Sequence, residues 1–226
     1  VATTNATGIM PNNDYDRYNF SFRNTTNFLN NKFILDTSAN YIIQNDKNMV
    51  SQGQYFNPLT SLYLFPRGED FSDVAVYERY DDLSGVNTQY WPYGDLGGVS
   101  SQNPYWIMNR MNRENDRRRY KLAASLQYNI IEGLNVQGRV SIDNTESKYT
   151  EKFHAGTVGN FAGPKGRYKE ENRLDRQVYA DVLVNFNKTF NEFNVTANLG
   201  ASIKDLRMEL TSLHGDLNNV TNHFTI

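Results

Sequence analysis

Residues 119–143 alternate between apolar and polar side chains with a period of two, and this alternation limits that stretch to β structure. The apolar set occupies the even positions: Tyr120, Leu122, Ala124, Leu126, Tyr128, Ile130, Leu134, Val136, Gly138, Val140 and Ile142. An α-helix needs apolar residues three or four positions apart, and that spacing would group Leu122 with Ser125 and Asn129. Residues 131–133 are too few for anything but a tight turn, so the sequence predicts two antiparallel strands here.

The same alternation recurs on both sides of this hairpin, and each recurrence predicts another pair of strands. The predicted strands lie near residues 15–28, 33–44, 118–130, 134–144, 176–188 and 193–205. Short turns at residues 29–32, 131–133 and 189–192 join the members of each pair. Long connections follow the pairs, and we expect external loops at residues 45–117, 145–174 and 206–226, with a further polar loop at residues 1–14.

A strict alternation of short and long connections is typical of outer-membrane barrels, whose tight turns lie at the periplasmic end. The sequence therefore predicts an all-β fold, namely a segment of an antiparallel transmembrane β-barrel about three hairpins wide. On this interpretation Leu126, Val140 and Val182 touch lipid. A soluble β-sandwich also has one apolar and one polar face, so the alternation alone leaves that alternative open.

Six strands are fewer than the roughly eight that a transmembrane barrel needs in order to close. An open sheet in lipid would leave unpaired backbone at both edges, which is energetically forbidden. We therefore expect residues 1–226 to be part of a single, larger barrel domain. Because the chain starts at Val1 without an initiator Met, we also expect further sequence upstream.

The composition excludes several classes of function. The formal net charge of −2 provides no basic field for nucleic acid. The chain has no cysteine, which excludes disulfides and thiolate metal sites. Its three histidines, His154, His214 and His223, are not spaced like a metal-binding pair. No apolar run is long enough to form a transmembrane helix.

Carboxylate pairs are the candidates for catalysis, and they lie at residues 69–70, 81–82 and 170–171. Glycoside hydrolysis needs two carboxylates facing each other across a bond on a rigid scaffold. Two carboxylates that are neighbours in the sequence of a loop are more often solvated charges than a catalytic pair. We therefore expect no enzyme activity, and a β-rich hydrolase is the least favoured class. We also expect no cofactor. Residues 12–16 (NNDYD) could supply oxygen ligands to calcium, but no complete EF-hand pattern follows, and a plain turn is the simpler interpretation.

Several short motifs, taken in order along the chain, resemble one transporter family. They are residues 8–13 (GIMPNN), 18–20 (YNF), 52–59 (QGQYFNPL), 63–68 (YLFPRG), 103–106 (NPYW), 117–120 (RRRY) and 138–143 (GRVSID). In this order they resemble the barrel of SusC/RagA-type TonB-dependent transporters of Bacteroidetes outer membranes. The resemblance covers nearly the whole chain, although each motif alone is weak.

The resemblance implies an outer-membrane importer with a barrel of about 22 strands and a plug in its lumen. Members of this family take up oligosaccharides or oligopeptides with energy from TonB, and a SusD-like surface lipoprotein covers the external loops as a lid. The plug and the TonB box would lie outside this chain, so the residues printed here give no argument about energy coupling. A surface-attached or soluble β-sandwich that binds carbohydrate remains the alternative.

Two sets of residues are candidates for contact with cargo or partners. Aromatic residues crowd the first long loop, and we expect them to touch a ligand or the lid: Tyr63, Phe65, Tyr90, Trp91, Tyr93, Tyr105 and Trp106. A small core internal to the loop is the alternative for this set. Charged residues on the polar face are expected to line the lumen: Arg119, Lys121, Arg139, Asp143, Asp181 and Lys204. Their mixed signs favour salt bridges with a plug over a single-sign ion filter.

Overall fold

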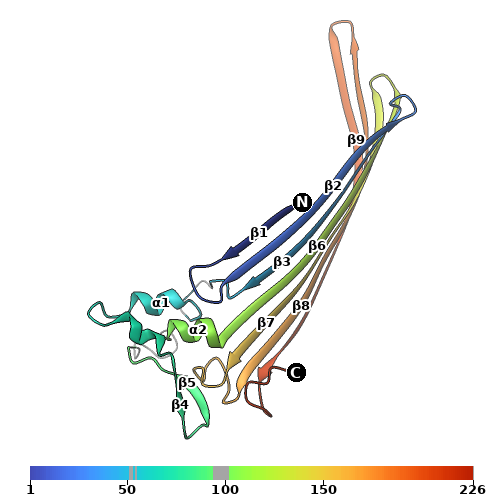
Figure 1. Cartoon of the computed structure of the whole chain (residues 1–226). Helices are drawn as coiled ribbons and strands as arrows, with labels where there is room; N and C mark the ends of the chain where they lie inside the picture. The colour runs from blue at the N-terminus through green and yellow to red at the C-terminus, as the bar shows by residue number, and fades with distance from the viewer. Residues whose placement is uncertain (51–52, 54, 94–101, 226) are drawn as a thin grey trace.

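The computed structural model describes residues 1–50, 53, 55–93 and 102–225. Most of the chain forms one antiparallel seven-stranded sheet in the order β1-β2-β3-β6-β7-β8-β9 (Figure 1). Its strands are β1 (Ala2–Thr7), β2 (Asp14–Phe28), β3 (Phe33–Lys47), β6 (Met111–Ile131), β7 (Leu134–His154), β8 (Gly166–Phe190) and β9 (Phe193–Asp216). The all-β antiparallel fold is confirmed. Gln52 and Gln54 of the QGQYFNPL motif lie outside the described residues.

The strand register joins the apolar positions of neighbouring strands into one continuous face. Leu122 on β6 lies opposite Ala39 on β3 and Ile142 on β7. On the next row along β6, Ala124 lies opposite Val140, which in turn lies opposite Ala180 on β8. Because residues paired across antiparallel strands point to the same side, these rows form the apolar face of the sheet, and the odd positions of β6 form the polar face.

Tight turns lie at one end of the sheet and the longer connections at the other (Figure 1). The turn between β6 and β7 depends on Gly133, which has a φ of 82°. A Cβ at this position would collide with the carbonyl oxygen of Asn187, whose N–H donates to the Gly133 carbonyl at 2.7 Å. Glycine is therefore required here both by the backbone conformation and by the close approach of β8.

The N-terminal strand β1 was not predicted, since residues 1–14 were expected to be a loop. β1 pairs with β2 from Ala2 opposite Asn19 to Thr7 opposite Asp14. Every residue of β1 is exposed. Its sequence, ATTNAT, contains no large apolar residue that could give an alternating signal, and the strand is held by backbone pairing at the sheet edge.

The strands also extend further than the sequence indicated, so the expected loop ranges were too long. β6 begins at Met111 instead of residue 118, β7 continues to His154, β8 begins at Gly166 and β9 continues to Asp216. In these extensions both faces carry polar side chains, as in Arg118 opposite Glu146. The contrast between apolar and polar positions disappears there, although the backbone ladder continues.

The segment between β3 and β6, residues 48–110, was expected to be an external loop and instead contains regular structure. We call it the inserted unit. It contains α1 (Pro58–Tyr63), the 3-10 helix η1 (Phe71–Ala75), the β4 (Glu78–Asp81) and β5 (Val86–Gln89) hairpin, and α2 (Pro104–Arg110). No helix in the described part of the chain is long and apolar enough to cross a membrane.

Candidate functional site

The polar face of the sheet carries the charged residues that the sequence placed in the lumen. Arg119 and Lys121 lie at odd positions of β6, and Asp143 lies opposite Lys121 on β7. Arg139 on β7 lies opposite Asp181 on β8. Lys204 on β9 lies opposite Tyr179 of the same face. The register thus brings all six residues to one side of the sheet.

Most of these charged residues form ion pairs with one another within the sheet. The Arg119 Nη2 lies 2.6 Å from Asp143 Oδ2, and the Arg139 Nη2 lies 2.8 Å from Asp181 Oδ2. Lys121 and Lys204 form no ion pair within the described residues. The charges of the polar face therefore largely neutralise one another, and the face carries no band of charges of a single sign.

The inserted unit packs against the end of the sheet on the side of the polar face. Its buried core combines Trp106 and Ile107 of the unit, Met111 and Phe153 of the sheet, and Ala162 of the connection between β7 and β8. Phe56, Tyr77 and Phe161 pack around them. Met111 and Phe153 are opposite each other on β6 and β7 and share the parity of the polar face. The unit therefore covers the end of the polar face and leaves the apolar face uncovered.

Asn103 organises the interior of the inserted unit and is fully buried. Its side-chain oxygen caps α2 by accepting from the Tyr105 N–H at 2.8 Å. Its amide nitrogen donates to the carbonyls of Val74 at 2.9 Å and Tyr90 at 3.1 Å. Its own N–H donates to the Gln89 side chain at 2.6 Å. One asparagine thus joins η1, the segment after β5, and α2.

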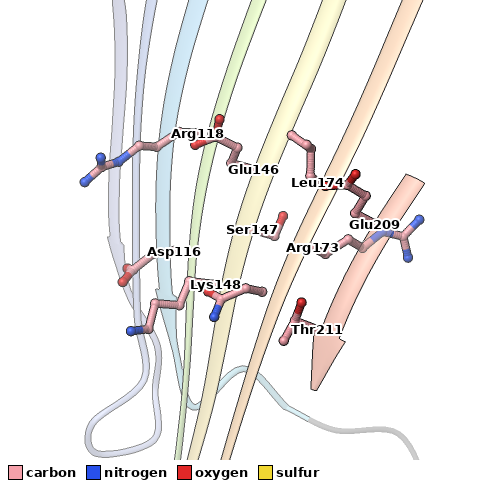
Figure 2. A pocket seen from close by; sticks show the side chains of 10 residues that line it. Asp116, Arg118, Glu146, Ser147, Lys148, Arg173, Leu174, Glu209 and Thr211 are labelled. Carbon is pink, nitrogen blue, oxygen red and sulfur yellow. The ribbon is translucent and has the colours of Figure 1, made fainter. Parts of the chain in front are cut away.

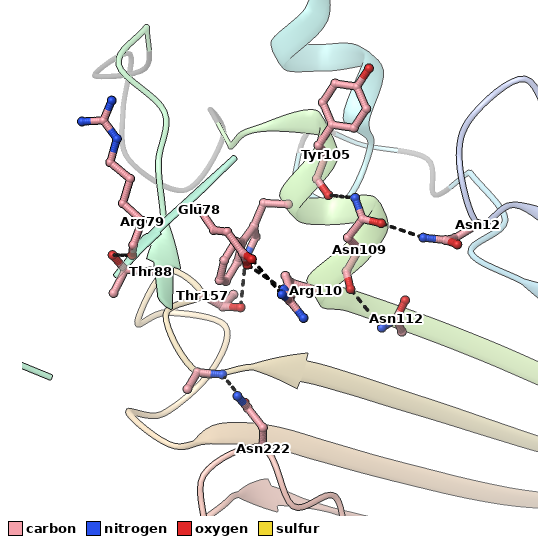
Figure 3. Close-up of polar contacts among 12 residues, drawn as sticks. Asn12, Glu78, Arg79, Thr88, Tyr105, Asn109, Arg110, Asn112, Thr157 and Asn222 are labelled. Carbon is pink, nitrogen blue, oxygen red and sulfur yellow. Dashed lines mark hydrogen bonds and ion pairs between the residues drawn. The ribbon is translucent and has the colours of Figure 1, made fainter. Parts of the chain in front are cut away.

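A second set of polar contacts fixes α2 to the segments around it (Figure 3). The Arg110 guanidinium donates to both carboxylate oxygens of Glu78 on β4, at 2.8 and 2.9 Å. This hydrogen bonding raises the pKa of Arg110. Asn12, from the turn between β1 and β2, donates to the side chain of Asn109 at 2.7 Å. The segment considered as a source of calcium ligands, for which a plain turn was the simpler interpretation, therefore uses Asn12 to hold the start of the sheet against α2.

The seven aromatic residues expected to contact a ligand or lid occupy very different environments. Trp106 is 0% exposed, and its Nε1–H donates to the Thr157 hydroxyl at 3.1 Å. This burial excludes direct contact in this conformation, contrary to the expectation for Trp106. Tyr63 at the end of α1 is 85% exposed and is the member of the set that is open to a partner.

The remaining five aromatic residues pack against other parts of the unit. Phe65 contacts Tyr93 edge to face with ring centroids 4.9 Å apart, and Trp91 contacts Tyr93 at 5.4 Å. The Arg79 guanidinium lies 3.3 Å from the centroid of the Tyr90 ring. Tyr105 is stacked with Tyr77 at 6.4 Å. Their rings are partly buried, so the alternative of a small internal core accounts for much of this set.

A polar cavity of about 320 Å³ lies where the inserted unit meets the end of β7 and the C-terminal segment. Arg110, His154 and Asn222 are among the residues that line it. Burial of the His154 ring, and then the nearby Arg110 charge, lowers the pKa of His154 from its ordinary value of 6.5. Asn222 accepts from the Ala155 N–H at 2.7 Å and so closes one side of the junction.

The acidic pairs have structural roles. Asp70 caps η1 by accepting from the Ser72 N–H at 2.9 Å, which lowers the pKa of Asp70. Asp81 accepts from the Ser84 hydroxyl in the turn after β4, which lowers the pKa of Asp81. Glu170 and Glu171 are consecutive on β8 and point to opposite faces. Glu170 and Glu171 therefore do not face one bond, and the described residues contain no group of three acidic or histidine side chains that could hold a metal ion.

Sequence reasoning missed Asn103 and both helices, although a local signal was present. Each helix begins with an asparagine followed by proline, Asn57-Pro58 at α1 and Asn103-Pro104 at α2. Asparagine is a favoured N-cap, and proline fits the first helical position because its missing N–H has no partner there. These dipeptides were interpreted as parts of family motifs and not as helix starts.

Comparison with known proteins gives matches among solved structures. No family model matches the chain, and no curated protein matches it at a significant level. Solved structures described as the RagAB peptide importer in the 'closed-closed' and 'open-open' states match 95% of this chain with TM-scores of 0.62 and 0.63 and 13% sequence identity. The chain spans 23% of the length of those chains. The likeness shows that the two share the fold of this sheet.

Proposed function

We propose that this chain forms part of the wall of an outer-membrane β-barrel importer, with the apolar face toward lipid and the polar face toward the lumen. The observation that supports it most directly is the exposure of the apolar face. Leu126 is 43% exposed, Val140 46% and Val182 53%. Burial in lipid would remove this surface from water, and a soluble monomer seldom exposes so large a continuous apolar area.

The alternative, a soluble β-sandwich, would need a second sheet over the same face. The described residues contain no such layer, since the inserted unit packs on the opposite side. The height of the apolar band also fits a membrane. At the rise of an antiparallel strand, the segment from Tyr120 to Tyr128 is about 27 Å long. Tilting the strand as in a barrel shortens its height along the membrane normal, and that height is then roughly the thickness of a barrel's apolar band.

Aromatic residues at both limits of the band support the same orientation. At the tight-turn end, Phe28, Phe33 and Tyr128 are stacked across three strands, with centroids 5.4 and 4.6 Å apart. At the other end, Tyr41 and Tyr120 lie opposite each other. Rings in these positions suit the two membrane interfaces, where one edge is in lipid and the other in water.

We further propose that the cargo is an oligopeptide or an oligosaccharide, that a SusD-like lipoprotein covers the inserted unit, and that TonB supplies energy through other parts of the complete protein. The name of the structural neighbours, a peptide importer, favours the peptide. The exposed Tyr63 ring is the contact that we assign to cargo or lid. The plug of the lumen is likewise proposed to lie outside residues 1–226.

A matched pair of variants tests the membrane orientation. Val140→Lys places a charge on the apolar face, and Ser141→Lys places the same charge one residue away on the polar face. We expect Val140→Lys to cost about 2–4 kcal/mol of membrane stability at mid-depth, and Ser141→Lys to have little effect. Folded barrel is measured by heat-modifiable mobility of the detergent-extracted protein. Equal effects of the two variants, or a complete protein that is soluble without detergent, would refute the proposal.

Cargo is tested by uptake of a labelled oligopeptide and a labelled oligosaccharide into cells that produce the complete protein. The expected result is uptake of the peptide that is lost in a Tyr63→Ala variant with unchanged barrel folding. Uptake of the saccharide alone would overturn the peptide assignment and leave the barrel orientation intact.

A further inference from the structure

The two faces of β9 exchange their character along the strand. As far as Ile203, the apolar residues of β9 point to the apolar face of the sheet, where Ile203 lies opposite Ala180 on β8. From residue 205 onward that side of β9 becomes charged, and large apolar residues instead occupy three successive positions of the polar face: Leu206, Met208 and Leu210. We call these three residues the apolar stripe.

The strand register places the apolar stripe among polar side chains. Leu206 lies opposite Gln177 on β8, and Gln177 in turn lies opposite Asp143 of the polar face. Met208 lies opposite Asp175. No other strand of the described sheet has large apolar residues at two successive positions of this face. The stripe is therefore a local departure from the pattern of the whole wall.

The other side of this part of β9 is polar. Glu209 lines a shallow groove of about 460 Å³ across the neighbouring strands, together with Arg118, Glu146 and Lys148 (Figure 2). Charges of both signs meet there, and Arg207 binds Glu209 on its own strand. That side can remain in water, so it is the apolar stripe that needs a contact.

The apolar stripe is uncovered within the described residues. Leu206 is 50% exposed, Met208 61% and Leu210 63%. By contrast, Met111 and Phe153 at the end of the polar face are covered by the inserted unit. Contiguous apolar surface that is left open on a polar face is typical of a binding site.

Lys204 directly precedes the apolar stripe on the same face. It forms no ion pair within the described residues. The aspartates of β8 beside it have partners, because Asp181 binds Arg139 at 2.8 Å and Asp175 binds Arg173 at 2.7 Å. The face thus presents an available cation at one end of three apolar side chains.

We infer that Lys204 and the apolar stripe bind an extended oligopeptide, with its terminal carboxylate at Lys204 and its alternate apolar side chains on the stripe. The inference rests on the proposed import function. Successive side chains on one face of a strand are about 6.8 Å apart, and an extended peptide repeats its side chains at the same interval. The distance from Lys204 to Leu210 is about 20 Å, the length of about six extended residues.

The residue types favour a peptide over other occupants. An oligosaccharide would use flat aromatic rings for its sugar faces, and the stripe consists of leucine and methionine. Met208 lies at the centre, and its flexible, polarizable side chain adapts to neighbours of different shape. Such a surface suits a changing series of peptides better than one permanent partner segment.

The test uses the complete protein in phosphatidylcholine nanodiscs, and fluorescence anisotropy measures the binding of labelled peptides. The probe is a hexapeptide that alternates serine and leucine and ends in a free carboxylate. One comparison peptide has the same composition with its leucines divided between both faces, and another is the probe with an amidated end. The variants are Met208→Gln and Lys204→Gln. Their matched controls are Met208→Leu, which stays apolar, and Lys204→Arg, which stays charged.

We expect the probe to bind about fivefold more tightly than the peptide with divided leucines, and Met208→Gln to weaken the probe by about the same factor, since each change removes one partly buried apolar contact. Lys204→Gln should weaken the probe about threefold and leave the amidated peptide unchanged, as expected for an exposed ion pair. Both control variants should bind like the original protein. Equal binding of the two carboxylate peptides, or no loss in Met208→Gln, would overturn the site.

Two further readouts separate this inference from its alternatives. A lower folded fraction of Met208→Gln in heat-modifiable mobility would show that the stripe packs against a fixed part of the complete protein, and would refute the peptide site. Uptake of a labelled oligopeptide that is unchanged in every variant would refute the stripe and leave the import function intact. Uptake of a saccharide alone would refute the peptide assignment itself.

Discussion

Replacing Trp106 separates a structural role from a contact role for the aromatic residues of the inserted unit. Trp106 is 0% exposed and packs with Phe153 and Met111 of the wall. Truncating a buried tryptophan to alanine costs about 3–5 kcal/mol, because the ring leaves a cavity that the surrounding structure cannot fill. The Thr157 hydroxyl, itself buried, also loses its partner, which adds about 1 kcal/mol.

This loss acts on the local stability of the unit, since wall strands are held by their own ladders. Hydrogen exchange of residues 55–93 and 102–110, measured by mass spectrometry in micelles, reports that local opening. A loss of 3 kcal/mol corresponds to opening roughly a hundredfold more often. Trp106→Phe, which keeps most of the ring and removes the indole N–H, is expected to have an intermediate effect.

Tyr63→Ala is the control, because its side chain is 85% exposed and its removal should leave exchange unchanged. If Tyr63 contacts cargo or a lid, this variant weakens binding without opening the unit, whereas Trp106→Ala weakens binding only as far as it opens the unit. Unchanged exchange in Trp106→Ala would refute the argument that this core holds the unit together, and faster exchange in Tyr63→Ala would refute the division of roles.

Three further outcomes follow from particular contacts. Gly133→Ala should lower barrel stability in urea by about 1–2 kcal/mol, because a left-handed residue gains a Cβ against the Asn187 carbonyl; an unchanged midpoint would contradict this. The lowered pKa of His154 means that the folded unit favours the neutral ring, so proteolytic protection should be full above pH 6.5, the ordinary pKa, and should decrease as the pH falls below it; His154→Gln should abolish that dependence. Arg139→Ala should reduce the folded fraction more than Asp181→Ala, because Asp181 is 8% exposed and would be left without its guanidinium partner, and the reverse order in heat-modifiable mobility would contradict the pairing.

Much of the wall was predictable because its signal is local and repeated. A one-residue error in register would move every side chain of a strand to the other face, so an alternation like that from Leu122 to Tyr128 fixes which face each residue joins. The pairing of Arg139 with Asp181 was not predictable in the same way. Both residues were assigned to the polar face, but whether they bind each other or a separate plug depends on which strands are neighbours.

The strand ends and the inserted unit show where the pattern stops being informative. On the N-terminal side of Tyr120 both faces of β6 carry polar side chains, so the contrast between apolar and polar positions vanishes there. The backbone ladder nevertheless extends back to Met111. Within the unit, residue type did not distinguish Trp106 from Tyr63. Both are aromatic residues in a polar segment, and one is fully buried while the other is almost fully exposed, because burial depends on contacts between segments distant in sequence.

The connection between the inserted unit and the wall limits how the unit can move. α2 ends at Arg110, and β6 begins at the next residue, Met111, which belongs to the same buried core as Trp106. A lid that swings as a rigid body needs a hinge, and a direct helix-to-strand junction buried in a core leaves little room for one. The β4–β5 hairpin is joined to α2 as well, because Glu78 on β4 binds Arg110 and the Gln89 side chain on β5 accepts from the Asn103 N–H at 2.6 Å. We therefore expect hydrogen exchange of β4, β5 and α2 to change together when cargo is added; exchange that increases in the hairpin while α2 stays protected would contradict this connection.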